Sequence, residues 1–308
     1  MIRRLLRTHN AALCVLIGAL GSTPTASAQD LEPRAYAASP VGVRFVGIAA
    51  GRSTGDVVVD PSLPIEDVAA TVGSVAAAAG TTFELFGRTA LVVAAFPYAR
   101  ASVSGRVGET SGHVVRAGFA DPRFRLSVNL LGGRALTPAE FAKTPRSTIV
   151  GVSVTVAPGL GSYDRTRLIN IGANRWSFKT EVGASWAFDK WTVETYAGAW
   201  TFTTNDQFYT GGAVRTQNPI VALQGHLGYT MKPRLWLAFD ATWYSGGATA
   251  VDGVEKRDLQ RNSRVGGTLS LPLAREQSIK VSASTGATTR SGSDFRTIAA
   301  AWQLTWLR

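Results

Sequence analysis

The stretch at residues 168–202, LINIGANRWSFKTEVGASWAFDKWTVETYAGAWTF, decides the fold of this chain. After a polar loop that ends at Arg175, apolar residues alternate with polar or small ones. One side carries Trp176, Phe178, Thr180, Val182, Ala184, Trp186 and Phe188, and the other carries Ser177, Lys179, Glu181, Gly183 and Ser185. Because successive side chains of a strand point to opposite faces, this period of two predicts a strand with one apolar and one polar face.

The strand turns at Asp189 and Lys190 and returns over residues 191–202, with aromatic residues near both ends. Each arm has about 12 residues, whereas strands of soluble proteins most often have roughly 5 to 6. A tilted strand of roughly 9 to 11 residues crosses a bilayer, and aromatic rings gather where such strands meet water. The hairpin therefore predicts two strands that span a membrane.

Composition and charge argue against two other classes of protein. Of the 308 residues, 45% are hydrophobic and 17% are charged, and the hydrophobic set leans on Ala, Val and Trp without heptads, which is not typical of a helical bundle. The formal net charge of +11 comes from basic residues spread singly along the chain, without a Lys/Arg cluster. We therefore expect no nucleic-acid partner.

The first 28 residues predict export. Three arginines precede a short apolar run at residues 11–21, and Ala26-Ser27-Ala28 is the small-x-small pattern that signal peptidase cleaves. Cleavage near Ala28 would lower the net charge from +11 to +8, because it removes three arginines and no acidic residue. It would also remove Cys14, the only cysteine, so we expect neither disulfides nor a thiolate metal site.

The remaining chain has no apolar run of about 18 residues, so no spanning helix is expected. An exported chain with many alternating segments is then either a soluble periplasmic β protein or an outer-membrane barrel, and the number of these segments distinguishes the two. We expect loops at 51–67 and 108–118, a kink or bulge at Pro97, and one helical turn within 136–141, where Thr137 caps and Pro138 starts the helix. The segments expected to be strands are 40–50, 68–83, 88–107, 120–131, 147–157, 176–188, 191–202, 219–230, 235–243, 265–273, 279–287 and 295–306.

An even number of about 12 strands is typical of bacterial barrels, whose connections alternate between short and long. The short ones, at 84–87, 189–190, 231–234 and 275–277, are expected on the periplasmic side, where the long 132–146 connection is an exception. Strands in lipid must form a closed sheet, because every backbone polar group needs a partner. The predicted fold is therefore all-β: a transmembrane antiparallel up-and-down β-barrel at 40–308, with both termini periplasmic. A short periplasmic segment at 29–39 precedes it.

Several ordered blocks of the sequence resemble a known family. They are DPRFRLSVNL at 121–130, RLINIGANRWSFK at 167–179, DATWYSGG at 240–247, DLQRNSR at 258–264 and AWQ at 301–303. Together they are similar to the outer-membrane transporter family labelled for the MetA pathway of phenol degradation. The resemblance implies a β-barrel that transports a solute. Thr180 stands where the family tends to carry proline, and the chain ends on Leu307-Arg308, whereas such barrels commonly end on an aromatic residue.

Polar residues on the inward faces are the candidates for a functional site. They could set a selectivity field for solutes or could simply fill the barrel by pairing with one another. The candidate lumen-lining residues are Arg123, Arg125, Asn129, Lys179, Glu181, Glu194, Gln224, His226, Asp240, Arg264, Lys280 and Gln303. His113 and His226 lack a metal-ligand spacing, and the glycine pairs lack a phosphate-loop pattern, so no metal, cofactor or catalytic residue is expected.

The sequence thus predicts an outer-membrane channel, not an enzyme, for passive uptake of small organic compounds, including aromatic or hydrophobic ones. Its expected partners are outer-membrane lipid, the barrel assembly machinery and the solute. A structural or adhesive barrel with a plugged lumen is the alternative. An outer-membrane hydrolase with His226 as base is a further, weaker hypothesis.

Overall fold

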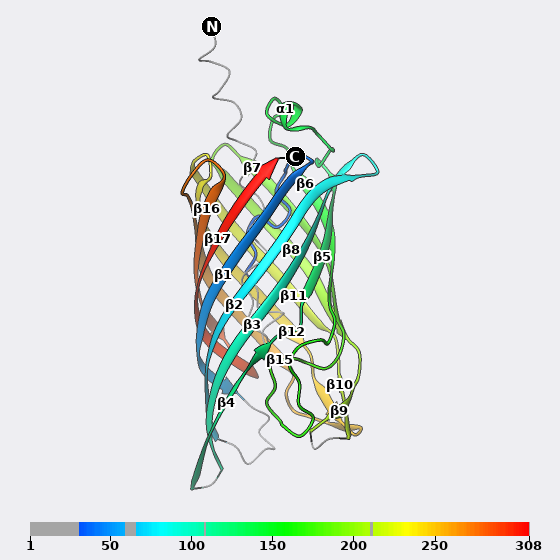
Figure 1. Cartoon of the computed structure of the whole chain (residues 1–308), viewed down its shortest axis with the longest axis vertical. Helices are drawn as coiled ribbons and strands as arrows, with labels where there is room; N and C mark the ends of the chain where they lie inside the picture. Colours follow the sequence, from blue (N-terminus) through cyan, green and yellow to red (C-terminus); the bar gives the residue numbers. More distant parts are fainter. Residues whose placement is uncertain (1–30, 59–65, 108, 210–211, 308) are drawn as a thin grey trace.

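The structure is a computed structural model that describes residues 31–58, 66–107, 109–209 and 212–307. The expected signal peptide and its cleavage site lie outside these residues. Figure 1 shows a tall barrel in which the last strand, in red, lies beside the first, in blue. Among the described residues, no helix is both long and apolar enough to pass through a membrane.

Twelve antiparallel strands form the wall, and β1 pairs with β17 to close it. This confirms the predicted fold class. The wall strands are β1 Val43–Val58, β2 Glu66–Leu85, β3 Arg88–Val107, β5 Arg123–Leu131, β6 Ile149–Ala157, β7 Ser177–Phe188, β8 Trp191–Phe202, β11 Ile220–Lys232, β12 Leu235–Gly246, β15 Gln260–Pro272, β16 Gln277–Thr288 and β17 Gly292–Leu307.

The alternation seen in the sequence becomes an inside and an outside. In β7, Val182 is 47% exposed on the outer face, whereas its neighbour Glu181 is only 5% exposed on the inner face. The outer face carries many such exposed apolar side chains, among them Leu126 and Ile298. A belt of this kind is unfavourable in water and favourable against lipid acyl chains.

The two ends of the barrel differ, as Figure 1 shows. We call the end with the short hairpin connections, β1's first residue and the C-terminus the turn end, and the opposite end the loop end. The turn end also carries α1, Pro138–Phe141, in the predicted position. Thr137 caps it and Glu140 reaches back to the Thr137 backbone, which is a complete capping box.

Two regions expected to be loops are strands. β1 continues through the predicted loop to Val58, because it pairs with β17 along its whole length. Residues 110–119 form β4, Thr110–Phe119, which pairs with β3 beyond the part that β5 occupies. β3 pairs with β5 as far as Ala95 and with β4 from Tyr98 onward. Its partner therefore changes at Pro97, where the sequence predicts a kink or bulge. The sequence did not predict these extensions because they are rich in polar side chains. Strands that extend beyond the membrane lose the apolar outer face, and with it the alternation that predicts a strand.

A second, four-stranded sheet lies at the loop end. It consists of β9 Asn205–Phe208, β10 Ala213–Gln217, β13 Thr249–Val251 and β14 Val254–Glu255. Its strands come from the connections that follow β8 and β12, so two long loops are tied together by backbone hydrogen bonds. This sheet places Arg215 of β10 over the mouth of the barrel interior.

Candidate functional site: the barrel interior

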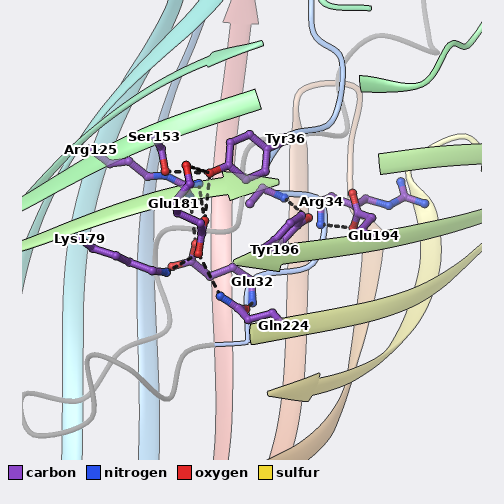
Figure 2. A network of polar contacts seen from close by, with 11 residues as sticks. Glu32, Arg34, Tyr36, Arg125, Ser153, Lys179, Glu181, Glu194, Tyr196 and Gln224 are labelled. Atoms are coloured by element: carbon purple, nitrogen blue, oxygen red, sulfur yellow. Dashed lines mark hydrogen bonds and ion pairs between the residues drawn. The ribbon is translucent and has the colours of Figure 1, made fainter. Parts of the chain in front are cut away.

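The chain before β1 lies inside the barrel. The sequence predicts a short periplasmic segment at 29–39 ahead of the barrel, but the described residues of that range contact the inner wall. We call residues 31–41 the plug. Its backbone donates hydrogen bonds from Glu32 to Gln224 and from Arg34 to Glu194 (Figure 2). These contacts have a physical cause, because the polar inner wall offers hydrogen-bond partners that a free segment would otherwise find in water.

Tyr36 anchors the plug to β6 and β7. Its side chain is 1% exposed, and its hydroxyl lies 2.9 Å from Ser153 Oγ and donates to Glu181 Oε1 at 3.1 Å. The ring fits because the facing wall residues are glycines. A Cβ atom on Gly151 or Gly183 would lie 2.4 or 2.3 Å from a ring carbon. Burial, reinforced by the Glu181 carboxylate, raises the pKa of the Tyr36 hydroxyl, which therefore stays protonated.

An ion-pair network joins the plug to the wall beside Tyr36 (Figure 2). Arg125 lies 2.9 Å from Glu32 of the plug and 3.4 Å from Glu181 of β7. Lys179 lies 2.6 Å from the second oxygen of Glu181, and Gln224 also donates to it. Two cations thus face two carboxylates in a nearly buried cluster, which balances the charge that burial would otherwise penalise.

Arg34 fixes the other side of the plug. Its guanidinium donates to Thr230 Oγ1 at 2.7 Å and lies 4.4 Å from the centre of the Trp236 ring. The Ala35 backbone donates to the hydroxyl of Tyr196, whose ring packs edge-on against Tyr36. The described plug is therefore held by side chains of several strands and lies in the lumen near the turn end.

A buried histidine and aspartate form a separate polar group. His226 Nδ1 lies 2.8 Å from Asp240 Oδ1, and Thr268 donates to the other Asp240 oxygen at 2.6 Å. Within the described part of the chain, His226 Nε2 has no hydrogen-bond partner, so no nucleophile is hydrogen-bonded to the atom that would act as base. No group of three or more potential metal ligands occurs among the described residues.

The structure places the twelve predicted lumen residues on the inner face of the wall. Ten have buried side chains, Arg125 is nearly buried, and Arg123 lines open space. The structure brings Arg125, Lys179, Glu181 and Gln224 together and pairs His226 with Asp240. Arg264 donates instead to the Phe295 carbonyl, and Gln303 donates to Thr305. Several of them pair with one another or with the plug. A role in selecting solutes stays a prediction.

Toward the loop end the lumen contains a cavity of about 770 Å³, which we call the loop-end cavity. Its wall is mostly apolar and includes Val72, Ala101, Ile171 and Phe295, which pack as one cluster. Trp200 and Arg123 line both this cavity and a space of about 30 Å³ that reaches Glu32 of the plug. The cavity therefore ends at the plug.

Two arginines, Arg175 and Arg215, line the loop-end cavity. Arg175 lies two residues before β7 and has its guanidinium over the Phe202 ring at 4.4 Å, while the Arg215 guanidinium lies over the Phe208 ring at 5.2 Å. Burial, with repulsion from Arg215, lowers the pKa of the Arg175 guanidinium to about 10, and burial also lowers the pKa of Arg215. Both remain charged at neutral pH.

Sequence reasoning missed Glu32, Arg34, Tyr36, Arg175 and Arg215. The three plug residues precede the first strand, and the two arginines lie in the connections between wall strands, so none of them belongs to a segment predicted to alternate. One signal was present: Gly151 and Gly183 replace side chains on inward positions of neighbouring strands, where they leave room for a ring. That signal identifies a close approach but not the residue that makes it.

The closed barrel, the apolar outer belt and the polar, partly filled interior define an outer-membrane β-barrel. The chain belongs to the family described as "Putative MetA-pathway of phenol degradation", which matches residues 49–303. No curated protein matches the sequence significantly.

Two solved structures share the fold. The crystal structure of an outer membrane channel from Pseudomonas putida F1 superposes with a TM-score of 0.78 at 20% sequence identity, covering 90% of this chain and 100% of that one. The β domain of the Bordetella autotransporter BrkA gives a TM-score of 0.54 at 11% identity, covering 86% and 100%. Both matches cover most of this chain, so they support the barrel fold.

Proposed function

We propose that this protein is a passive outer-membrane channel for small, mainly apolar organic solutes. The observation that carries the proposal is the loop-end cavity: its volume of about 770 Å³ and its mainly apolar wall suit a small organic molecule. Membership of the family adds support for a transport role. Because short turns face the periplasm in bacterial barrels, the cavity faces the cell exterior and the plug faces the periplasm.

Transport in this scheme needs no nucleotide or cofactor. A solute leaves water for the apolar cavity, moves down its concentration gradient and passes the plug when the plug shifts. The contacts that hold the plug are individually replaceable hydrogen bonds and ion pairs, each with a modest net free energy of about 0.5–3 kcal/mol. The plug is therefore the gate of the proposed channel. After a solute passes, the plug would form its hydrogen bonds and ion pairs with the polar inner wall again.

A second function is favoured by one observation. Because the plug fills the lumen near the turn end, the barrel could remain closed and act through its loop-end surface, as a structural or adhesive protein. The four-stranded sheet of β9, β10, β13 and β14 supplies an ordered surface there. Solute flux distinguishes this function from the channel.

The test measures accumulation of radiolabelled 2-naphthalenemethanol in de-energised bacterial cells that produce the full chain. Cells with the wild-type barrel should fill faster than cells with Ala101→Trp, which places a large ring in the cavity that Ala101 lines. The matched control is Ala197→Trp, because Ala197 is exposed on the outer face of β8. Equal rates for wild type and Ala101→Trp, with both barrels folded, would favour the closed barrel.

A further inference from the structure

Arg175 and Arg215 both reach the loop-end cavity without a carboxylate partner. Within the described residues, neither guanidinium forms an ion pair. The acidic groups that attract them are engaged elsewhere. Asp121 accepts hydrogen bonds from the Gly161 and Ala173 backbone. Asp258 accepts them from Thr249. The two cations therefore face the cavity with their charge uncompensated at short range.

The Arg175 guanidinium keeps one buried N–H donor without a partner among the described residues. One of its terminal nitrogens, Nη2, donates to Gln217 Oε1, and the Gln217 amide is fixed in turn by Gly247. The other, Nη1, is buried and has no partner among the described residues. An unpaired buried donor on a charged group is costly, so structures rarely keep one without a ligand or water to satisfy it. Arg175 and Gln217 both line the loop-end cavity.

The guanidinium of Arg175 lies 4.4 Å from the centre of the Phe202 ring, and that of Arg215 lies 5.2 Å from the centre of the Phe208 ring. The edge of a guanidinium carries parallel N–H groups. Such an edge matches the two oxygens of a carboxylate, which it binds with two parallel hydrogen bonds. The cluster of Val72, Ala101, Ile171 and Phe295 also lines the cavity and offers apolar contact. The cavity therefore combines a cationic pair with a hydrophobic wall.

From this arrangement we infer that the loop-end cavity binds an organic carboxylate, with its anionic head at Arg175 and Arg215 and its apolar body against the Val72–Ala101–Ile171–Phe295 wall. The inference rests on the proposed function and narrows its solutes to organic acids. An anion at this position relieves the repulsion between the two arginines. A neutral or cationic molecule of the same shape does not.

The test uses calorimetric titration of the full-length folded barrel in nanodiscs of uncharged lipid. The probes are 2-naphthoate, 2-naphthalenemethanol and naphthalen-2-ylmethylammonium, which share a ring system and differ in charge. We expect 2-naphthoate to bind at least about tenfold more tightly than the alcohol, since a charge-assisted hydrogen bond contributes that much. The ammonium should bind most weakly. If the wild-type barrel bound 2-naphthoate and 2-naphthalenemethanol with equal affinity, the inference would be overturned.

Variants locate the binding site. Arg175→Gln and Arg215→Gln should each weaken 2-naphthoate binding about tenfold and leave the alcohol unchanged. Arg175→Lys should fall between wild type and Arg175→Gln, because it keeps the charge and loses the planar edge. Arg165→Gln is the control, since Arg165 is exposed on the same loop and lies outside the cavity lining. An equal loss in Arg165→Gln would mean that long-range charge alone attracts the acid.

The two proposals fail separately. If 2-naphthalenemethanol uptake depends on the open cavity but 2-naphthoate shows no binding preference, the carboxylate inference is wrong and the channel stands. If 2-naphthoate binds through both arginines and no solute crosses, the binding site stands and the channel is wrong.

Discussion

The carboxylate of Glu32 lies 2.9 Å from the guanidinium of Arg125, and this ion pair ties the plug to β5 across 93 positions of sequence. Arg125 also reaches Glu181, so the pair is part of a network and not an isolated contact. Because Glu32 is the plug's own charge in that network, its removal tests directly whether the plug is a gate.

We expect Glu32→Gln to increase single-channel conductance in planar bilayers. The two side chains are 11% and 15% exposed and Arg125 keeps Glu181, so the plug should be weakened by about 1–2 kcal/mol, less than for an isolated buried pair. A loss of about 1.4 kcal/mol raises the open population about tenfold. Glu66→Gln is the control, because Glu66 pairs with Arg106 on the exposed loop end. Unchanged conductance in Glu32→Gln would show that the ion pair does not hold the gate.

Gly183→Ala should loosen the plug by sterics alone. The new Cβ would lie 2.3 Å from Tyr36 Cε2 and 2.7 Å from Tyr196 Cδ1, so the Tyr36 ring must move. We expect faster hydrogen exchange at the plug amides and a higher open probability. Gly225→Ala on β11 is the matched control, because a Cβ atom added at Gly225 would meet nothing within 4 Å. Identical exchange in the two variants would place the plug's stability elsewhere.

Asp240→Ala should destabilise the barrel by about 2–4 kcal/mol. Asp240 is fully buried and bonds both His226 and Thr268, and each buried group left without a partner costs about 1–3 kcal/mol. Urea unfolding in lipid vesicles, followed by tryptophan fluorescence, measures the change. Thr242→Val, on the same strand and face, should be nearly neutral, since Thr242 Oγ1 has no partner among the described residues. If both variants unfold alike, the His226–Asp240–Thr268 contacts contribute little.

Acid should release the loop that carries Arg175. Hydrogen bonds from the Thr166 hydroxyl and backbone lower the pKa of Asp164. Because its pKa is lower in the folded loop, the carboxylate stabilises the loop above its ordinary pKa of about 3.9 and stops doing so as the pH falls through the lowered value. Pepsin cleavage within residues 158–175 should therefore rise steeply below about pH 3.9. Asp164→Asn should remove most of that pH dependence, and a steep rise that persists in this variant would assign it to another group.

The limits of prediction can be traced to particular residues. Lys179 and Glu181 were assigned to the interior because they alternate with Phe178 and Val182, and lipid enforces that pattern. β4 was missed because its polar sequence lies where pairing with β3, and not lipid contact, stabilises the strand. The sequence predicts a short segment at 29–39 and does not show whether that segment enters the lumen, because nothing periodic marks a segment that packs against a curved inner wall.

The sequence by itself determined the closed all-β barrel, the twelve wall strands and the inward polar faces, because the membrane imposes a period of two and forbids free strand edges. Only the tertiary structure decided that residues 31–41 pack inside the barrel. It also decided that Arg175 and Arg215, 40 positions apart, line one mainly apolar cavity. These contacts join loops and termini across the barrel, and their geometry depends on closure of the whole sheet, which no local pattern records.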